Sequence, residues 1–89
     1  MRKFDLGKLV ATPGALEVLR AAGVNVFFIV SRHQSGDWGD LGRDDKRAND
    51  DAIVHGGRIL SCYVVGGEKL YVITEADRSS TCVLRANEY

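Results

Sequence analysis

The sequence has 89 residues, which suits one domain with a modest core and leaves little room for both a deep catalytic cleft and a separate binding domain. Hydrophobic residues make up 45% and charged residues 27%, so we expect the chain to fold rather than stay disordered. The 12 basic and 12 acidic residues cancel, which argues against general nucleic-acid binding because that requires an excess of Lys and Arg. A local basic face is still compatible with a net charge of zero.

The sequence predicts no membrane span, cofactor or metal centre. Its longest apolar run, residues 26–30, is far too short to cross a bilayer. Residues 1–5 lack the apolar stretch of a signal peptide, so we expect a cytoplasmic protein. Cys62 and Cys82 do not have the spacing of a zinc site, and the sequence contains no phosphate-binding or dinucleotide-binding motif.

A strand followed by a helix is predicted at the start of the chain. Apolar and polar side chains alternate, imperfectly, over residues 4–11, which favours a strand. Thr12 can cap a helix, and Pro13 suits the first helical position because the N–H that proline lacks has no partner there. Gly23 supplies a stop for this helix.

Residues 24–33 carry two conflicting signals. Their β-branched and aromatic content favours a strand. Asn25 is a good helix cap, however, and apolar side chains recur at spacings of three and four, as on one face of a helix. This stripe consists of Val26, Ile29, Val30 and His33. We therefore predict a second short helix that packs against the first.

A loop and a third helix are expected next. Residues 35–42 contain three glycines, which favours a loop. Residues 43–55 are predicted to be helical, with Asp44 and Asp45 in the first turn, where a negative charge suits the helix dipole. The apolar side of this helix is thin, so we expect the helix to lie on the surface.

The C-terminal third is predicted to be an antiparallel meander. Strands at residues 58–65 and 68–75 flank a tight turn at Gly66-Gly67, and a third strand follows at residues 80–85. The expected fold is a single α+β domain over the whole chain. It has an antiparallel sheet of three to four strands, the fourth from the N-terminal segment, covered on one face by two to three short helices.

The register of this meander keeps the two cysteines apart. The hairpin turn places Cys62 opposite Tyr71, and the next turn places Cys82 opposite Ile73. The two thiols then lie on strands separated by the middle strand, roughly 10 Å apart, whereas a disulfide needs Cα atoms within about 7 Å. We therefore predict two free, mostly buried thiols.

His33 is a candidate functional residue at the end of the second predicted helix. With Asp37 and Asp40 nearby in the sequence, it could act as a general base or a metal ligand. The alternative, which we favour, is a structural histidine that hydrogen-bonds the last carbonyl groups of its helix.

The segment Asp37-Trp38-Gly39-Asp40 has three interpretations. Its carboxylates resemble part of a calcium loop, but the oxygen ligands are too few, which disfavours a metal site. Trp38 could fold back as a lid on the core while the carboxylates cap the next helix. A partly exposed Trp38 could instead anchor a protein partner, and we give these last two interpretations equal weight.

Charged residues also gather at the end of a predicted strand, namely Glu75, Asp77 and Arg78. Together with His33 they would suit metal-independent RNA cleavage, which needs a base, an acid and a guanidinium that stabilises developing negative charge. The alternative, which we favour, is an ion pair in the turn between Asp77 or Glu75 and Arg32 or Arg78.

Five segments carry a resemblance to a known group of proteins. They are LGKLVATPGAL at residues 6–16, RH at 32–33, SGDWGD at 35–40, GRILS at 57–61 and ITEADRS at 73–79. In these segments the chain resembles small uncharacterised bacterial proteins of plasmids and integrative elements, known only as plasmid-related proteins. The resemblance implies a helix that ends at residues 32–33 and a role in mobile-element biology, without a particular activity.

Two functional hypotheses follow. The favoured one is an accessory or anti-defence interaction module that binds a protein partner, with nucleic acid as a less favoured partner and no membrane. The predicted binding surface comprises Arg32, His33, Asp37, Trp38, Asp40, Asp77 and Arg78. The alternative is a small metal-independent RNA-cleaving or other hydrolytic enzyme, with His33, Glu75 and Arg78 as candidate catalytic residues. The sequence leaves the oligomeric state open.

Overall fold

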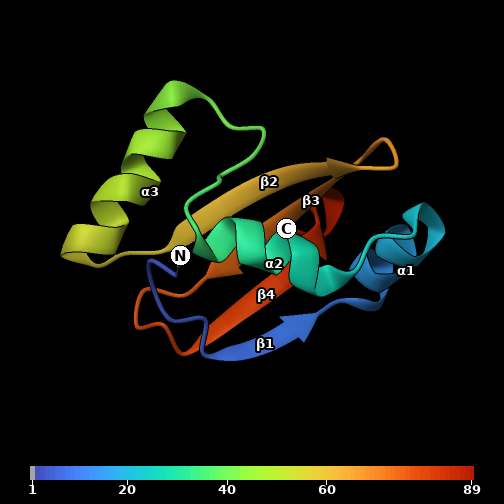
Figure 1. Cartoon of the computed structure of the whole chain (residues 1–89), viewed down its shortest axis with the longest axis horizontal. Helices are drawn as coiled ribbons and strands as arrows, with labels where there is room; N and C mark the ends of the chain where they lie inside the picture. The colour runs from blue at the N-terminus through green and yellow to red at the C-terminus, as the bar shows by residue number, and fades with distance from the viewer. Residues whose placement is uncertain (1) are drawn as a thin grey trace.

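One four-stranded sheet and three helices make up the structure, a computed structural model that describes residues 2–89 (Figure 1). The predicted α+β class is confirmed. In chain order the elements are β1 (Lys8–Ala11), α1 (Pro13–Ala22), α2 (Val26–Gln34), α3 (Arg43–His55), β2 (Ile59–Val65), β3 (Glu68–Thr74), β4 (Ser80–Arg85) and the 3-10 turn η1 (Ala86–Glu88).

The capping residues that the sequence offers determine α1 and α2. The Thr12 hydroxyl accepts a hydrogen bond from the N–H of Ala15, and Gly23 ends α1 in the left-handed conformation at φ 68°. The Asn25 side chain then accepts from the N–H of Phe27 at 2.8 Å, which starts α2. The predicted helix is thus confirmed, because the cap and the buried stripe prevail over the strand propensity of Val26 and its neighbours.

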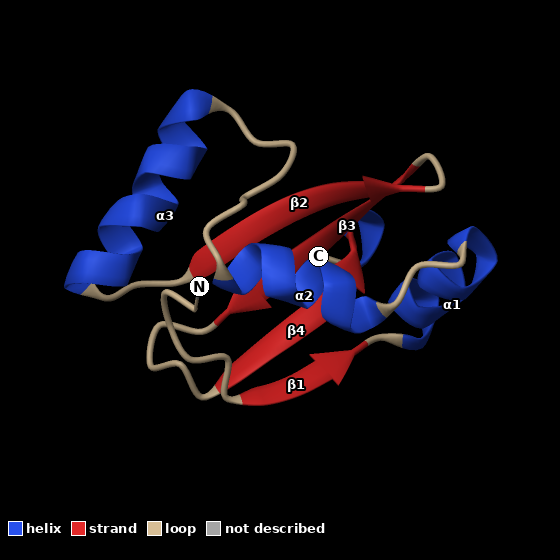
Figure 2. Ribbon diagram, in the orientation of Figure 1, coloured by secondary structure: helices blue, strands red, loops and turns tan. Residues whose placement is uncertain are grey.

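Helix α3 lies beside the edge of the sheet rather than across its face (Figure 2). Only Asn49 and Ala52 are buried, in keeping with the thin apolar side of this helix. The Asn49 side chain forms two hydrogen bonds with the backbone of Leu60, donating to its carbonyl at 2.7 Å and accepting from its N–H at 3.1 Å. Asn49 therefore satisfies backbone groups of β2 that face away from β3.

The strand order is β1-β4-β3-β2, and the sheet is mixed. Strands β2, β3 and β4 form the predicted antiparallel meander, in which Cys62 pairs with Tyr71 and Ile73 with Cys82, as the register predicts. Both cysteines are free; Cys62 is buried and Cys82 partly buried.

Strand β1 corrects the expectation of a wholly antiparallel sheet, because it runs parallel to β4. All three helices and the β2–β3 hairpin connect these two strands, and such a long crossover permits the parallel direction. The strand is also shorter than the predicted residues 4–11. It begins only after Gly7, whose φ is +64° and where a Cβ would collide with the backbone of Arg78 and Ser79.

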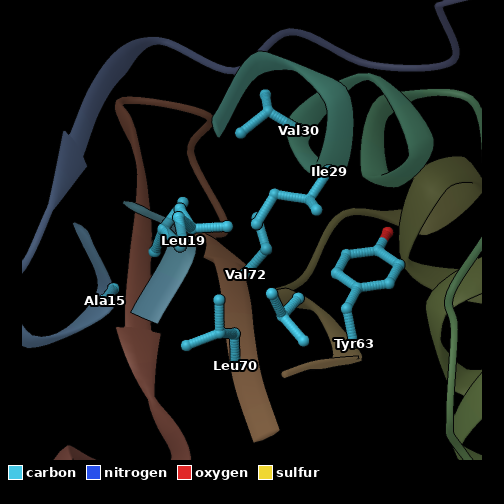
Figure 3. Close-up of a cluster of buried hydrophobic side chains, with 9 residues drawn as sticks. Ala15, Leu19, Ile29, Val30, Tyr63, Leu70 and Val72 are labelled. Atoms are coloured by element: carbon cyan, nitrogen blue, oxygen red, sulfur yellow. The ribbon is translucent and has the colours of Figure 1, made fainter. Parts of the chain in front are cut away.

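Helices α1 and α2 pack on the same face of the sheet and form the main core with it (Figure 3). Leu19 of α1 and Ile29 of α2 meet Val72 from the centre of the sheet. The opposite face meets η1 and the ring of Tyr89, which contacts Tyr71 edge to face at 5.7 Å. The predicted coverage of one face by helices therefore holds for α1 and α2.

Among residues 2–89, no single helix is long and apolar enough to cross a membrane. Helices α1 and α2 reach the required length and apolar composition only when they are counted together, and their axes are bent by 105°.

Candidate functional site

His33 lies in the core, with no exposed surface. Its Nδ1 lies 2.6 Å from the Ser61 hydroxyl and its Nε2 lies 2.9 Å from the Thr74 hydroxyl. The predicted hydrogen bonds to the last helix carbonyls are therefore wrong. Both ring nitrogens are engaged inside the protein, and burial lowers the pKa of His33 to about 4. At neutral pH the residue is an uncharged core histidine without a free nitrogen for a substrate or a metal ion.

A series of hydrogen bonds runs from His33 across the neighbouring strands β3 and β4. The Thr74 hydroxyl lies 2.7 Å from that of Thr81, which donates to the carbonyl of Leu6 at 2.8 Å. Because each hydroxyl has one hydrogen, Thr81 must accept from Thr74, and Thr74 must accept from Nε2–H of His33. Nδ1 then accepts from Ser61. We call His33, Ser61, Thr74 and Thr81 the buried polar seam; all four side chains are fully buried.

Trp38 covers one end of this seam. It is only 4% exposed, it donates through Nε1 to Asp50 of α3 at 3.0 Å, and it stacks on Phe4 at 6.2 Å. Phe4 in turn meets the ring of His33 edge to face at 5.1 Å. The burial of Trp38 as a lid on the core is confirmed, and the interpretation as a partly exposed anchor is wrong. The expected capping of the next helix by the carboxylates is also wrong, because α3 begins after Gly42 without a side-chain cap and the Asp37 carboxylate binds Arg32.

The glycine next to Trp38 lets its loop form an isolated parallel bridge with the edge strand β2, in which Gly39 pairs with Cys62. The N–H of Cys62 donates to the carbonyl of Trp38 at 3.1 Å, and the N–H of Asp40 donates to the carbonyl of Cys62 at 2.6 Å. Gly39 has φ 76°, and a Cβ there would collide with the Cys62 carbonyl. The loop thus protects backbone groups of β2 that α3 does not reach.

Arg32 and Asp37 form an ion pair at the surface, with Nε and Oδ2 2.7 Å apart. The hydrogen bond to Arg32 is the main cause that lowers the pKa of Asp37. The Arg32 guanidinium also lies over the ring of Tyr63, whose hydroxyl donates to the Asp37 carbonyl at 2.6 Å, and burial raises the pKa of Tyr63 to about 12. These contacts fasten the loop to α2. Within residues 2–89, no group of three His, Cys, Asp or Glu residues is placed to hold a metal ion.

Arg78 binds backbone carbonyl groups rather than a carboxylate. Its Nη1 donates to Gly57 at 2.5 Å and also to the carbonyls of Glu75 and Ala76, while Nη2 donates to Ala52 at 2.9 Å. The guanidinium therefore ties the C-terminal end of α3 to the β3–β4 turn, where the Arg78 backbone itself is left-handed at φ 61°.

The predicted turn ion pair is wrong. Asp77 accepts from the N–H of Ser79 at 3.0 Å, and Glu75 pairs with Arg58 at 3.4 Å. Arg58 also donates to the Tyr89 hydroxyl. Glu75 therefore points to the Tyr89 side of the sheet, whereas its neighbour Thr74 points to His33 on the helix side. The structure therefore separates His33 from Glu75, and Arg78 contacts Glu75 only through the backbone carbonyl.

The structure reveals an apolar surface that the sequence interpretation missed. Phe27 and Phe28 in the first turn of α2 are 65% and 61% exposed, and Leu16 of α1 is 41% exposed. A groove of about 340 Å³ lies between the two helices. We call this the α1–α2 groove; its lining residues are Leu16, Leu19, Arg20, Val24, Asn25, Val26 and Phe27. The signal was present, because both phenylalanines lie off the buried stripe once α2 is taken as a helix.

Comparison of the chain with known protein families finds no matching family, and comparisons with curated proteins and with solved structures find no significant match.

Proposed function

We propose that this protein is a protein-interaction module that binds its partner through the α1–α2 groove and the adjoining Phe27 and Phe28. The observation that carries the proposal is the exposure of these two phenylalanines, at 65% and 61%. Removing one such ring from water stabilises a complex by about 1.5–3 kcal/mol. Clustered exposed apolar groups are typical of binding surfaces, whereas single ones are ordinary.

The proposed surface replaces the one expected from the sequence. Trp38 and His33 are buried, and Arg78 is bound to four carbonyl groups, so these side chains have little to offer a partner. Phe27 and Leu16, by contrast, present carbon surface beside a groove that a partner side chain could enter. The resemblance to plasmid-related proteins supports a mobile element as the biological setting of this binding, and an accessory or anti-defence role there is part of the proposal.

The RNA-cleaving alternative has little support from the geometry. A general base must reach the proton that it removes, and His33 is enclosed with both nitrogens occupied. Glu75 points to the opposite side of the sheet. His33 and Glu75 therefore cannot act on one substrate atom, and the guanidinium of Arg78 is occupied by four carbonyl groups.

A pull-down from a bacterium that carries such an element tests the proposal. We would compare wild type with the double variant Phe27→Ser/Phe28→Ser, and use Val54→Ser as the control because Val54 is an equally bare apolar residue on α3, 75% exposed. The proposal expects a protein that wild type and Val54→Ser retain and that the double variant loses. Equal retention by all three would show that the surface is wrong. If wild type captures no protein, an RNA-cleavage assay of wild type and His33→Ala becomes the next experiment.

A further inference from the structure

The charge of the α1–α2 groove restricts what can occupy it. Five of its seven lining residues are apolar, and Arg20 is the one charged residue among them. Arg20 is exposed and, within residues 2–89, has no carboxylate within ion-pair distance. The carbonyls of Arg20 and Leu19 near the end of α1 are bound by the N–H groups of Gly23 and Val24.

Two helix ends of opposite dipole sign also face the groove. Helix α2 begins at Val26, directly after Asn25, and both residues line the groove. The N-terminus of a helix carries roughly half a positive charge from its aligned peptide dipoles, whereas the last turn of α1, which contributes Leu19 and Arg20 to the lining, carries roughly half a negative charge. These two partial charges offset each other, so Arg20 sets the sign of the potential, and the groove suits an apolar side chain next to a carboxylate.

The backbone of the occupant can also be inferred. The groove is lined by side chains of two helices and of the link Val24-Asn25 between them, and it offers no open strand edge. An extended segment would bury unpaired N–H and C=O groups against Leu16 and Phe27. A helix satisfies its own backbone groups and can place anchors at i, i+3 or i+4, and i+7 along such a groove.

We infer that the α1–α2 groove accepts an acidic amphipathic helix of a protein partner, with its apolar face on Leu16, Val24 and Phe27 and a carboxylate on Arg20. This inference rests on the proposed function and adds the chemistry of the partner. A lipid surface fits less well, because peripheral helices that bind anionic membranes carry several basic residues beside their apolar face, and here the groove holds only Arg20.

A peptide-display selection tests the inference. The library consists of short helices with apolar residues at i, i+3, i+4 and i+7 and random residues elsewhere, selected in parallel on wild type, Arg20→Glu and Phe27→Ser. Wild type should enrich peptides rich in Asp and Glu, whereas Arg20→Glu should reverse the preference toward Lys and Arg. For an individual acidic peptide, Arg20→Glu should weaken binding about tenfold or more, and added salt should reduce that difference.

The outcomes distinguish an error in the partner's charge from an error in the binding surface. If wild type and Arg20→Glu select peptides of the same charge, the acidic partner is wrong while the groove remains the binding surface. If Phe27→Ser enriches the same peptides as wild type, or wild type enriches none, the proposed surface itself is wrong. Binding of wild type to phosphatidylglycerol vesicles with loss in Phe27→Ser would assign the surface to lipid. Self-association in sedimentation that Phe27→Ser abolishes would assign it to a second copy of the chain.

Discussion

The buried polar seam and the α1–α2 groove are opposites in composition and in position. The seam places a histidine and three hydroxyls in the core, whereas Phe27 of the groove and its neighbour Phe28 are exposed to solvent. Polar residues in a sequence attract functional interpretations, yet here they hold β2, β3, β4 and α2 together. A polar group that is fully hydrogen-bonded inside a protein is structural, and an apolar group without cover is the better indicator of binding.

The largest loss of stability is expected when Trp38, which covers one end of the buried polar seam, is removed. Trp38→Ala should lower the free energy of unfolding by about 3–5 kcal/mol, because it empties a large buried volume and leaves Asp50 without its indole donor. That is a large part of the total for a small domain. Urea unfolding followed by circular dichroism measures the loss. Trp38→Phe, which keeps a ring on Phe4, should lose less, and an unchanged midpoint in Trp38→Ala would contradict a core role.

Acid should lower the stability of the protein by protonating His33 in the buried polar seam. The pKa of His33 is about 4 in the folded protein and its ordinary value is 6.5, so the unfolded chain takes up the proton first as the pH falls. Stability is therefore highest above pH 6.5 and declines by up to about 3 kcal/mol as the pH falls to 4.

Urea midpoints measured across this range test the pH prediction. His33→Phe should be less stable than wild type at neutral pH, but its free energy of unfolding should change little between pH 6.5 and pH 4. The carboxylates whose pKa is lowered, such as Asp37, affect stability mainly at lower pH. A wild-type profile as flat as that of His33→Phe would refute the neutral, buried state of the histidine.

Substitution of Arg78 by Lys tests whether this residue stabilises the fold by its charge or by its hydrogen bonds to carbonyl groups. Arg78→Lys keeps the positive charge but cannot reach four carbonyl groups, so it should destabilise the protein by about 2 kcal/mol. Arg32→Lys, at an exposed ion pair, should cost less than about 1 kcal/mol. Thermal unfolding of both variants side by side compares them. Equal shifts would show that Arg78 contributes only charge.

The smallest effect is expected in the groove. Phe27→Ser and Phe28→Ser should each change the free energy of unfolding by no more than about 0.5 kcal/mol, because both side chains are exposed in the free protein. Ile29→Ala, one residue further along α2, should cost about 2–4 kcal/mol since Ile29 is buried. Urea unfolding of the three variants checks this contrast. A large loss in either serine variant would mean that the rings support the fold rather than a partner.

Local chemistry made much of the fold predictable. Asn25 and the stripe of α2 identified a helix against strand propensity, and Gly66-Gly67 determined the register that keeps the two cysteines apart. The direction of β1 could not be predicted, because a strand pattern carries no information on which neighbour it will join.

The site was predictable only in part. The seam depends on hydroxyls far apart in the chain, and Ser61, Thr74 and Thr81 look like ordinary strand residues until the sheet aligns them with His33. The burial of Trp38 depends in the same way on Phe4 and Asp50, which lie in other segments. Phe27 and Phe28 are plain in the sequence, but their exposure can be predicted only once residues 26–34 are known to be a helix.

The pairing of β1 with β4 has a consequence for how the protein forms. These strands come from opposite ends of the chain, and two side-chain contacts join the same ends: the Thr81 hydroxyl donates to the Leu6 carbonyl, and the Thr12 hydroxyl donates to Glu88. A chain synthesised from its N-terminus can build α1, α2 and the β2–β3 hairpin early, yet β1 must wait for β4 to emerge. Contacts of such long sequence separation slow folding, so the closing of this sheet is expected to be the late event that commits the molecule to its native state.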